Sequence, residues 1–246
     1  MGRKRKVNTE NVDISDRARL LREETPFAIR EAYIKLRTNL TFCLTTDKER
    51  PCRTFAVTSA NPSEGKSITA ANIAISFALL GKKVILIDAD MRKPKQHILW
   101  DNKNEHGLSD YLAKRSRLEL VKVKNLPHWI LGAGTISPNP SELLSLERMK
   151  HLVEDCAGIS DYVIIDTPPI NTVADAQIIS SFLDGTVVVA RAGETRSGEL
   201  THALDQIRGA GGNLCGVILN DVDMKSSKYS YGKYRKKYGY GYSSGY

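Results

Sequence analysis

The sequence predicts an α/β protein in which helices cover both faces of a mostly parallel β-sheet. Five short runs are apolar at nearly every position and rich in β-branched residues, which is typical of strands buried on both faces. Segments with helical patterns lie between several of these runs, and strands that alternate with helices favour parallel pairing. A chain of 246 residues is long enough to bury a substantial core in one domain.

The first expected helix begins at Thr25-Pro26, with Thr25 as its N-cap and Pro26 as its first helical residue. Its apolar positions follow one another at spacings of four, three and four residues, so they form one stripe. These positions are Ile29, Tyr33, Leu36 and Leu40. Residues 1–24 are polar and charged, and we expect them to form a separate basic N-terminal arm.

From residue 54 onward, strands and helices are expected to alternate within one domain that spans residues 25–224. The strands are expected at 54–60, 83–90, 161–169, 184–193 and 214–223. The helices are expected at 67–83, 138–144 and 197–212. The middle helix carries Asn139 as N-cap, Pro140 at the first position and Glu142 at the third, which is the pattern of a capping box.

The positive charge is concentrated at the two ends of the chain. The formal net charge is +8, and ten basic residues lie within 3–6 and 225–237, segments without an acidic residue. The rest of the chain therefore carries −2, which disfavours a nucleic-acid-binding face across the body of the domain. Residues 225–246 are rich in Tyr, Gly, Lys and Ser, and we expect a flexible tail that is too polar to fold alone.

Several classes of protein are disfavoured by what the sequence lacks. The scattered cysteines form no CxxC pair, which argues against a zinc site, an iron–sulfur cluster and a disulfide framework. They are Cys43, Cys52, Cys156 and Cys215. The sequence contains no run of about 18 apolar residues, so it predicts no membrane span. Its basic start lacks the apolar stretch of a signal peptide.

The segment SANPSEGKS, residues 59–67, lies between an expected strand and an expected helix, where a phosphate-binding P-loop belongs. Gly65 allows backbone N–H groups to close around phosphate oxygens, and the helix N-terminus adds partial positive charge. Lys66 can reach the β- and γ-phosphates, and the Ser67 hydroxyl can bind Mg²⁺. Ala60 stands where such loops usually carry their first glycine, and it is nearly as small.

Three carboxylates follow apolar strands and complete this pattern. Asp88 ends VILID, Asp90 comes two residues later, and Asp166 ends VIID. Carboxylates at the C-terminal ends of parallel strands face the ligand crevice, so the set can hold a metal–nucleotide complex. Asp175 and Arg191 are expected near other strand ends, either as outer supports of the site or as partners in structural salt bridges.

In this order, and followed by a tyrosine-rich end, the motifs SANPSEGKS, VILIDADMR and YVIIDTPP resemble those of the bacterial tyrosine kinases. The resemblance extends over about residues 25–246 and is strongest to the cytoplasmic capsular and exopolysaccharide kinases of the CpsD/CapB type. It implies a P-loop NTPase-like fold and an ATP-dependent protein-tyrosine autokinase. The enzyme would phosphorylate its own C-terminal tyrosine cluster in trans and thereby regulate capsule or exopolysaccharide synthesis and export.

The same resemblance implies a role for each matching residue. Lys66, Asp88 and Asp166 would be catalytic, with Asp88 orienting or deprotonating the acceptor hydroxyl. Ser67 and Asp90 would hold Mg²⁺. The residues that would bind ATP are Asn61, Ser63, Glu64, Gly65, Lys66, Ser67, Ile68 and Asn220, the last at the adenine. The phosphate acceptors would be Tyr229, Tyr231, Tyr234, Tyr238, Tyr240, Tyr242 and Tyr246.

Partners are also implied by the resemblance. They are a separate transmembrane activator or polysaccharide co-polymerase, a protein-tyrosine phosphatase and further copies of the chain in a ring. The chain would be cytoplasmic and peripheral at the inner face of the membrane. Glu31 and Arg37 match the Glu-x-x-Arg-x-x-Arg pattern that the family uses for ring assembly, but Ile34 replaces its middle arginine. Packing of this helix onto its own domain is the alternative.

Two other functions share some of these features. A ParA/MinD-like ATPase switch on membrane or DNA has the same fold and motifs, but its P-loop carries an early second lysine that SANPSEGKS lacks. A binding module without catalysis could hold single-stranded nucleic acid through the basic, aromatic tail. Both are less consistent with the full set of motifs than a tyrosine kinase is.

Overall fold

The structure is a computed structural model that describes residues 16–44 and 52–223. A seven-stranded sheet has the order β3-β4-β2-β5-β1-β6-β7. Every neighbouring pair is parallel except β3 and β4, so the predicted mostly parallel sheet is confirmed. The strands are β1 Arg53–Ser59, β2 Val84–Asp88, β3 Val121–Lys122, β4 His128–Leu131, β5 Tyr162–Asp166, β6 Gly185–Arg191 and β7 Leu214–Asn220.

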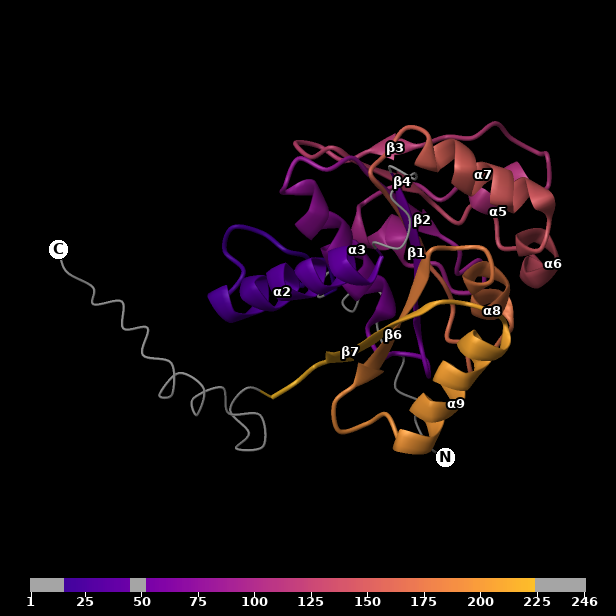
Figure 1. Cartoon of the computed structure of the whole chain (residues 1–246). Coiled ribbons are helices and arrows are strands. Elements are labelled where there is room, and N and C mark those ends of the chain that lie inside the picture. Colours follow the sequence, from indigo (N-terminus) through magenta and orange to yellow (C-terminus); the bar gives the residue numbers. More distant parts are fainter. Residues whose placement is uncertain (1–15, 45–51, 224–246) are drawn as a thin grey trace, which may run out of the picture.

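Helices cover both faces of this sheet (Figure 1). Those in the described residues are α2 Phe27–Cys43, α3 Lys66–Ala78, α4 Gln96–Leu99, α5 Leu108–Leu112, α6 Pro140–Leu144, α7 Glu147–Ala157, α8 Asp175–Ser180 and α9 Ser197–Gly209. Alternate residues of the same strands pack on opposite faces. On β2, Val84 and Leu86 join a core with α3, whereas Ile85 and Ile87 join a second core with α7. None of the described helices is long and apolar enough to cross a bilayer.

Several elements differ from the sequence prediction. The first helix begins at Phe27 with Pro26 as its N-cap, one residue later than expected. The Thr25 hydroxyl accepts a hydrogen bond from the Arg22 backbone N–H at 2.9 Å, so it faces the preceding turn. Asn139 and Pro140 stand at the predicted N-cap and first position of α6. The strands β3 and β4 and the helices α4, α5, α7 and α8 were not predicted.

The described part of the expected N-terminal arm lies against α3. The side chain of Asn72, which is buried, accepts a hydrogen bond from the Leu21 N–H at 2.7 Å and donates one to the Arg19 carbonyl at 3.0 Å. Leu20 is buried in the core beside α3. Residues 19–21 therefore pack against the domain, and the limits of the arm stay a prediction.

Candidate active site

The predicted site residues meet at the carboxyl ends of β1, β2 and β5. Asp88 and Asp166 end neighbouring strands and are paired directly in the sheet register. Lys66 begins α3, which follows β1 through the P-loop. The side chains of Asp88, Asp166 and Asp90 are buried, and that of Lys66 is nearly so. Four ionisable groups are thus held together away from bulk water.

The loop before α3 has the backbone conformation of a phosphate cradle. Ser63 and Gly65 have positive φ angles of 67° and 88°, so the chain turns sharply into the helix. Gly65 is the N-cap of α3, and no side chain caps this end. Because the first N–H groups of a helix have no partner within the helix, they remain available to an anion.

Two residues of the predicted nucleotide set support the P-loop from within. The Glu64 carboxylate is buried, where it accepts hydrogen bonds from the Asn61 N–H at 2.9 Å and from the Thr195 hydroxyl. The Asn220 side chain, at the end of β7, donates a hydrogen bond to the Glu64 carbonyl at 2.9 Å. Asn220 therefore braces the loop here, and its contact with adenine stays a prediction.

Lys66 forms the centre of the charge cluster. Its Nζ lies 2.8 Å from Asp90 Oδ2, 3.5 Å from Asp166 Oδ1 and 3.2 Å from the Ser67 hydroxyl. Burial on its own lowers the pKa of this ammonium, but the charges of Asp166 and Asp90 outweigh burial and raise the pKa above its ordinary value. Lys66 is therefore a permanent cation at the position where phosphates are expected.

Asp88 is held by backbone donors on both of its oxygens. Oδ1 accepts from the Asp90 N–H at 3.1 Å, and Oδ2 accepts from the N–H groups of Lys95 and Gln96 at 3.0 and 2.9 Å. Burial, together with the charge of Asp166, raises the pKa of Asp88 to about 8. A carboxyl group with such a pKa holds a proton more tightly than an exposed aspartate does, so its deprotonated form is the stronger base.

Asp166 is positioned by Gln96, a residue that sequence reasoning missed. Gln96 Nε2 donates to Asp166 Oδ2 at 2.9 Å, and this glutamine is fully buried. Asp166 Oδ1 has no hydrogen-bond partner among the described residues, although it faces the Lys66 ammonium. Burial raises the pKa of Asp166, and the charge of Lys66 opposes this effect.

The oxygen atoms at this site suit Mg²⁺. Among the described residues, no three His, Cys, Asp or Glu side chains form a metal cage. Magnesium is commonly held by only one or two carboxylates together with substrate phosphates and water, so no such cage is needed. The Ser67 hydroxyl and the carboxylate of Asp90 both contact Lys66 Nζ, and Asp166 Oδ1 lies 3.5 Å from the same nitrogen.

The two residues whose roles were left open both form salt bridges. Asp175, at the start of α8, is fully buried and pairs with Arg92, whose Nε lies 3.1 Å from Asp175 Oδ2. Because Arg92 follows the DAD segment, this pair fastens the loop after β2 to α8. Arg191 pairs with Asp221 at 2.7 Å, which links the ends of β6 and β7.

The helix predicted to assemble a ring also packs on its own domain. Arg37 Nη1 donates to the Ser76 carbonyl of α3 at 2.7 Å, whereas Ile34 is 40% exposed. Glu31 is half-buried on the same helix. Assembly through Glu31 and Arg37 stays a prediction. The seven predicted acceptor tyrosines lie outside the described residues.

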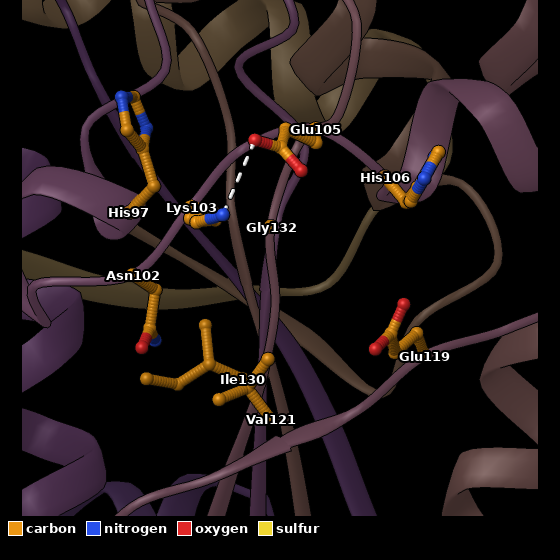
Figure 2. Close-up of a pocket in the computed structure, with 9 residues that line it drawn as sticks. All are labelled: His97, Asn102, Lys103, Glu105, His106, Glu119, Val121, Ile130 and Gly132. Carbon is orange, nitrogen blue, oxygen red and sulfur yellow. Dashed lines mark ion pairs between the residues drawn. The ribbon is translucent and has the colours of Figure 1, made fainter.

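A separate pocket of about 300 Å³ lies beside the end of β4 (Figure 2). Its lining contains His97, His106, Glu119 and the Lys103–Glu105 ion pair, whose charged atoms are 3.6 Å apart. None of the predicted site residues lines it. The pocket is therefore distinct from the cluster around Lys66.

Comparison with known proteins identifies the family of this chain. The family model for the CobQ/CobB/MinD/ParA nucleotide binding domain matches residues 55–234. Tyrosine-protein kinase YwqD of Bacillus subtilis is 43% identical over 204 residues, which cover 82% of this chain and 85% of that protein. Tyrosine-protein kinase CpsD of Streptococcus agalactiae is 36% identical over 211 residues, covering 84% and 90%.

Solved structures give the same result. The chimerical protein CapA2B2 has a TM-score of 0.78 at 34% identity, with 83% of this chain and 90% of that chain covered. The kinase domain of the Escherichia coli tyrosine kinase ETK has a TM-score of 0.76 at 33% identity, covering 88% and 80%. The MinC:MinD complex of Aquifex aeolicus shares the fold, with a TM-score of 0.61 at 24% identity over 73% of each chain. The chain therefore belongs to the bacterial tyrosine-protein kinases, built on the nucleotide-binding domain that MinD and ParA also use.

Proposed function

We propose that this kinase transfers the γ-phosphoryl group of ATP to tyrosines of its own C-terminal segment. The observation that carries the proposal is the buried cluster of Lys66 with Asp88, Asp90 and Asp166 next to an uncapped P-loop helix. The same chain ends in seven tyrosines within residues 229–246. The chain thus combines groups that can bind phosphate and accept a proton with many tyrosines that can accept the phosphoryl group.

The residues of the chain divide the work of phosphoryl transfer. The P-loop N–H groups and Lys66 bind and orient the phosphates, which is the larger part of catalysis in such enzymes. Ser67 and Asp90 would hold Mg²⁺, with Asp166 in support, and the ion when bound supplies positive charge against the phosphate oxygens. Their contacts around Lys66 Nζ, at 2.8–3.5 Å, support this assignment.

Asp88 acts as the proton acceptor in this scheme. A tyrosine hydroxyl has a pKa of about 10 and holds its proton at neutral pH. As the tyrosine oxygen bonds to the γ-phosphorus, the bond from that phosphorus to the β,γ-bridging oxygen breaks and ADP leaves. The hydroxyl proton passes to the deprotonated form of Asp88, and the pKa of about 8 makes that carboxylate a stronger base than an exposed aspartate.

The phosphoryl group is transferred between chains. Because the C-terminal tail is positively charged, its phosphorylation can act as a switch. Residues 225–246 carry six basic and no acidic residues. Each phosphotyrosine adds roughly −1.5 to −2, so three or four of them cancel this charge and further ones reverse it. We propose that this change weakens docking of the tail on acidic surfaces and loosens a ring formed through Glu31 and Arg37. A protein-tyrosine phosphatase would reset the tail.

The relatives suggest the setting of this reaction. One is named a tyrosine-protein kinase in the cps region of Klebsiella pneumoniae, and the chimera CapA2B2 is a solved relative. We propose that the chain works at the inner face of the membrane with a separate transmembrane activator, and that it controls capsule or exopolysaccharide synthesis and export.

Incubation of the full chain with Mg·ATP tests the proposal, with and without the cytosolic segment of the activator. We expect phosphotyrosine on blots, its loss in Lys66→Met, and modified tyrosines within 229–246 by mass spectrometry. A mixture of Lys66→Met with a chain that lacks its tail tests transfer between copies. ATP hydrolysis without any phosphotyrosine in an active preparation would favour the ATPase switch.

A further inference from the structure

We propose that Gln96 is a positioning residue that sets the orientation of Asp166 and of the P-loop helix in the metal–nucleotide site. The inference rests on the roles proposed above for Ser67 and Asp166. No sequence motif includes Gln96. Its contacts in the site are with side chains and backbone groups of other residues of the protein. It would therefore act through them rather than on the reacting atoms.

Gln96 connects three parts of the site from the first turn of α4. Its Nε2 donates to Asp166 Oδ2 at 2.9 Å and to the Ser67 carbonyl at 3.0 Å. Its own N–H donates to Asp88 Oδ2 at 2.9 Å. One fully buried residue thus joins the end of β5, the start of α3 and the end of β2.

The bond from Gln96 decides which oxygen of Asp166 faces the ligands. With Oδ2 held by the amide, Oδ1 is turned toward Lys66 Nζ at 3.5 Å and accepts no hydrogen bond from the described residues. Without Nε2, Oδ2 would be buried without a partner, and the carboxylate would gain by rotating toward another donor. A rotated Asp166 would no longer support a cation beside Ser67.

Trp100 in turn fixes the orientation of the Gln96 amide. Its indole Nε1, which can only donate, lies 3.1 Å from Gln96 Oε1. The amide oxygen must therefore face Trp100, and Nε2 must face Asp166 and Ser67. The Trp100 ring stacks edge-on against His128 with centroids 4.8 Å apart. The indole of Trp100 thus contacts Gln96 on one side and His128 on the other. Its fluorescence emission should therefore change when the contact with Gln96 changes.

The test compares Gln96→Met, which keeps volume but removes the amide, with Gln177→Met as a matched control. Gln177 Nε2 donates a hydrogen bond to Gln206 Oε1 at 2.9 Å between α8 and α9, away from the site. We expect Gln96→Met to weaken binding of Mg·ADP by about 10–100-fold, as loss of an outer support of a metal site does. Binding of ADP without Mg²⁺ should change less than threefold, and Gln177→Met should bind both like the parent.

Fluorescence gives a readout independent of turnover. In a Trp129→Phe background, Trp100 is the single tryptophan of the chain. Mg·ADP should change its emission, and Gln96→Met should abolish that response. Trp100→Phe removes the indole N–H that holds the Gln96 amide, together with part of the ring, and it should show the same selective loss of Mg·ADP affinity to a smaller extent. This second variant keeps the test valid if Gln96→Met fails to fold, as judged by circular dichroism.

Asp166→Asn separates this inference from the proposed site. If Asp166→Asn binds Mg·ADP as the parent does, the assignment of Asp166 itself is wrong. If Asp166→Asn is impaired while folded Gln96→Met and Trp100→Phe keep parental affinity for Mg·ADP, Gln96 is not a positioning residue. Equal losses with and without Mg²⁺ would likewise show that Gln96 only supports the fold.

Discussion

Replacement of Gly65 by alanine should damage the P-loop in a way that depends on Asn220. A Cβ added at Gly65 would lie 2.2 Å from Asn220 Nδ2, so the two groups cannot both keep their places. The Asn220 side chain could move, but it would then lose its 2.9 Å hydrogen bond to the Glu64 carbonyl. Gly65 also has a φ of 88°, in the left-handed region that disfavours any residue with a Cβ.

Two costs add in the Gly65→Ala variant. The left-handed conformation costs roughly 1–2 kcal/mol for a residue other than glycine. Loss of the Asn220 hydrogen bond adds about 1 kcal/mol. The sum of about 2–3 kcal/mol lowers the melting temperature by roughly 4–12 °C for a domain of this size. Affinity for ADP should fall as well, because the strained residue caps the helix end that faces the phosphates.

A double-mutant cycle separates the two costs. In an Asn220→Ala background the amide is already absent, so Gly65→Ala should cost only the conformational part, about 1–2 kcal/mol. Denaturant unfolding of the four proteins, with ADP titrations, measures the difference. Equal costs of Gly65→Ala in both backgrounds would refute the steric coupling to Asn220. Parental stability of the single variant would refute the strained backbone as well.

Three further predictions concern other residues. Burial lowers the pKa of His128 to about 3, so only the unfolded chain takes up its proton as the pH falls below about 6.5. The free energy of unfolding therefore falls as the pH is lowered, by about 2 kcal/mol at pH 5. In urea titrations of His128→Phe, the free energy of unfolding should depend less on pH in the acidic range. Arg37→Ala should lower the free energy of unfolding, measured by urea titration, by about 1–3 kcal/mol, because its hydrogen bond to the Ser76 carbonyl is lost. The loss should appear even in dilute, monomeric protein. Glu31→Ala should change stability by less than about 0.5 kcal/mol, and an equal effect of both would point to a shared interface instead. Asp88→Asn should slow tyrosine phosphorylation about 10²–10⁴-fold in a radiolabel assay while ADP still binds, and a near-parental rate would exclude it as the base.

The sheet and the charge cluster could be predicted because local sequence encodes both. Each central strand is an apolar run, and each catalytic candidate follows such a run or begins the next helix. Parallel pairing then does the rest, since it places Asp88 beside Asp166 at one edge of the sheet. The positions of these residues thus follow from their order in the chain and from one rule of sheet topology.

Other parts depend on contacts that no local pattern describes. β4 has only four residues and includes His128 and Trp129, so it lacks the apolar run that marked the other parallel strands. Gln96 reaches Asp166 across 70 positions of the sequence because the loop after β2 folds back over the strand ends. Asn220 was expected to bind adenine, but its bond to the Glu64 carbonyl depends on how β7 meets the P-loop.

The balance of charge in the site argues that it is built for a ligand rather than for stability. Three carboxyl groups are buried near one ammonium, which pairs directly with two of them, and burial of unbalanced charge is among the most expensive arrangements in a fold. Burial is the largest cause of the raised pKa values of Asp88 and Asp166, so ionising these carboxyl groups is costly in this site. A purely structural cluster would be more stable with apolar residues in these places. An excess of carboxylate beside an uncapped helix N-terminus is instead suited to a complex that contains both a cation and phosphates, which is what phosphoryl transfer from a nucleotide requires.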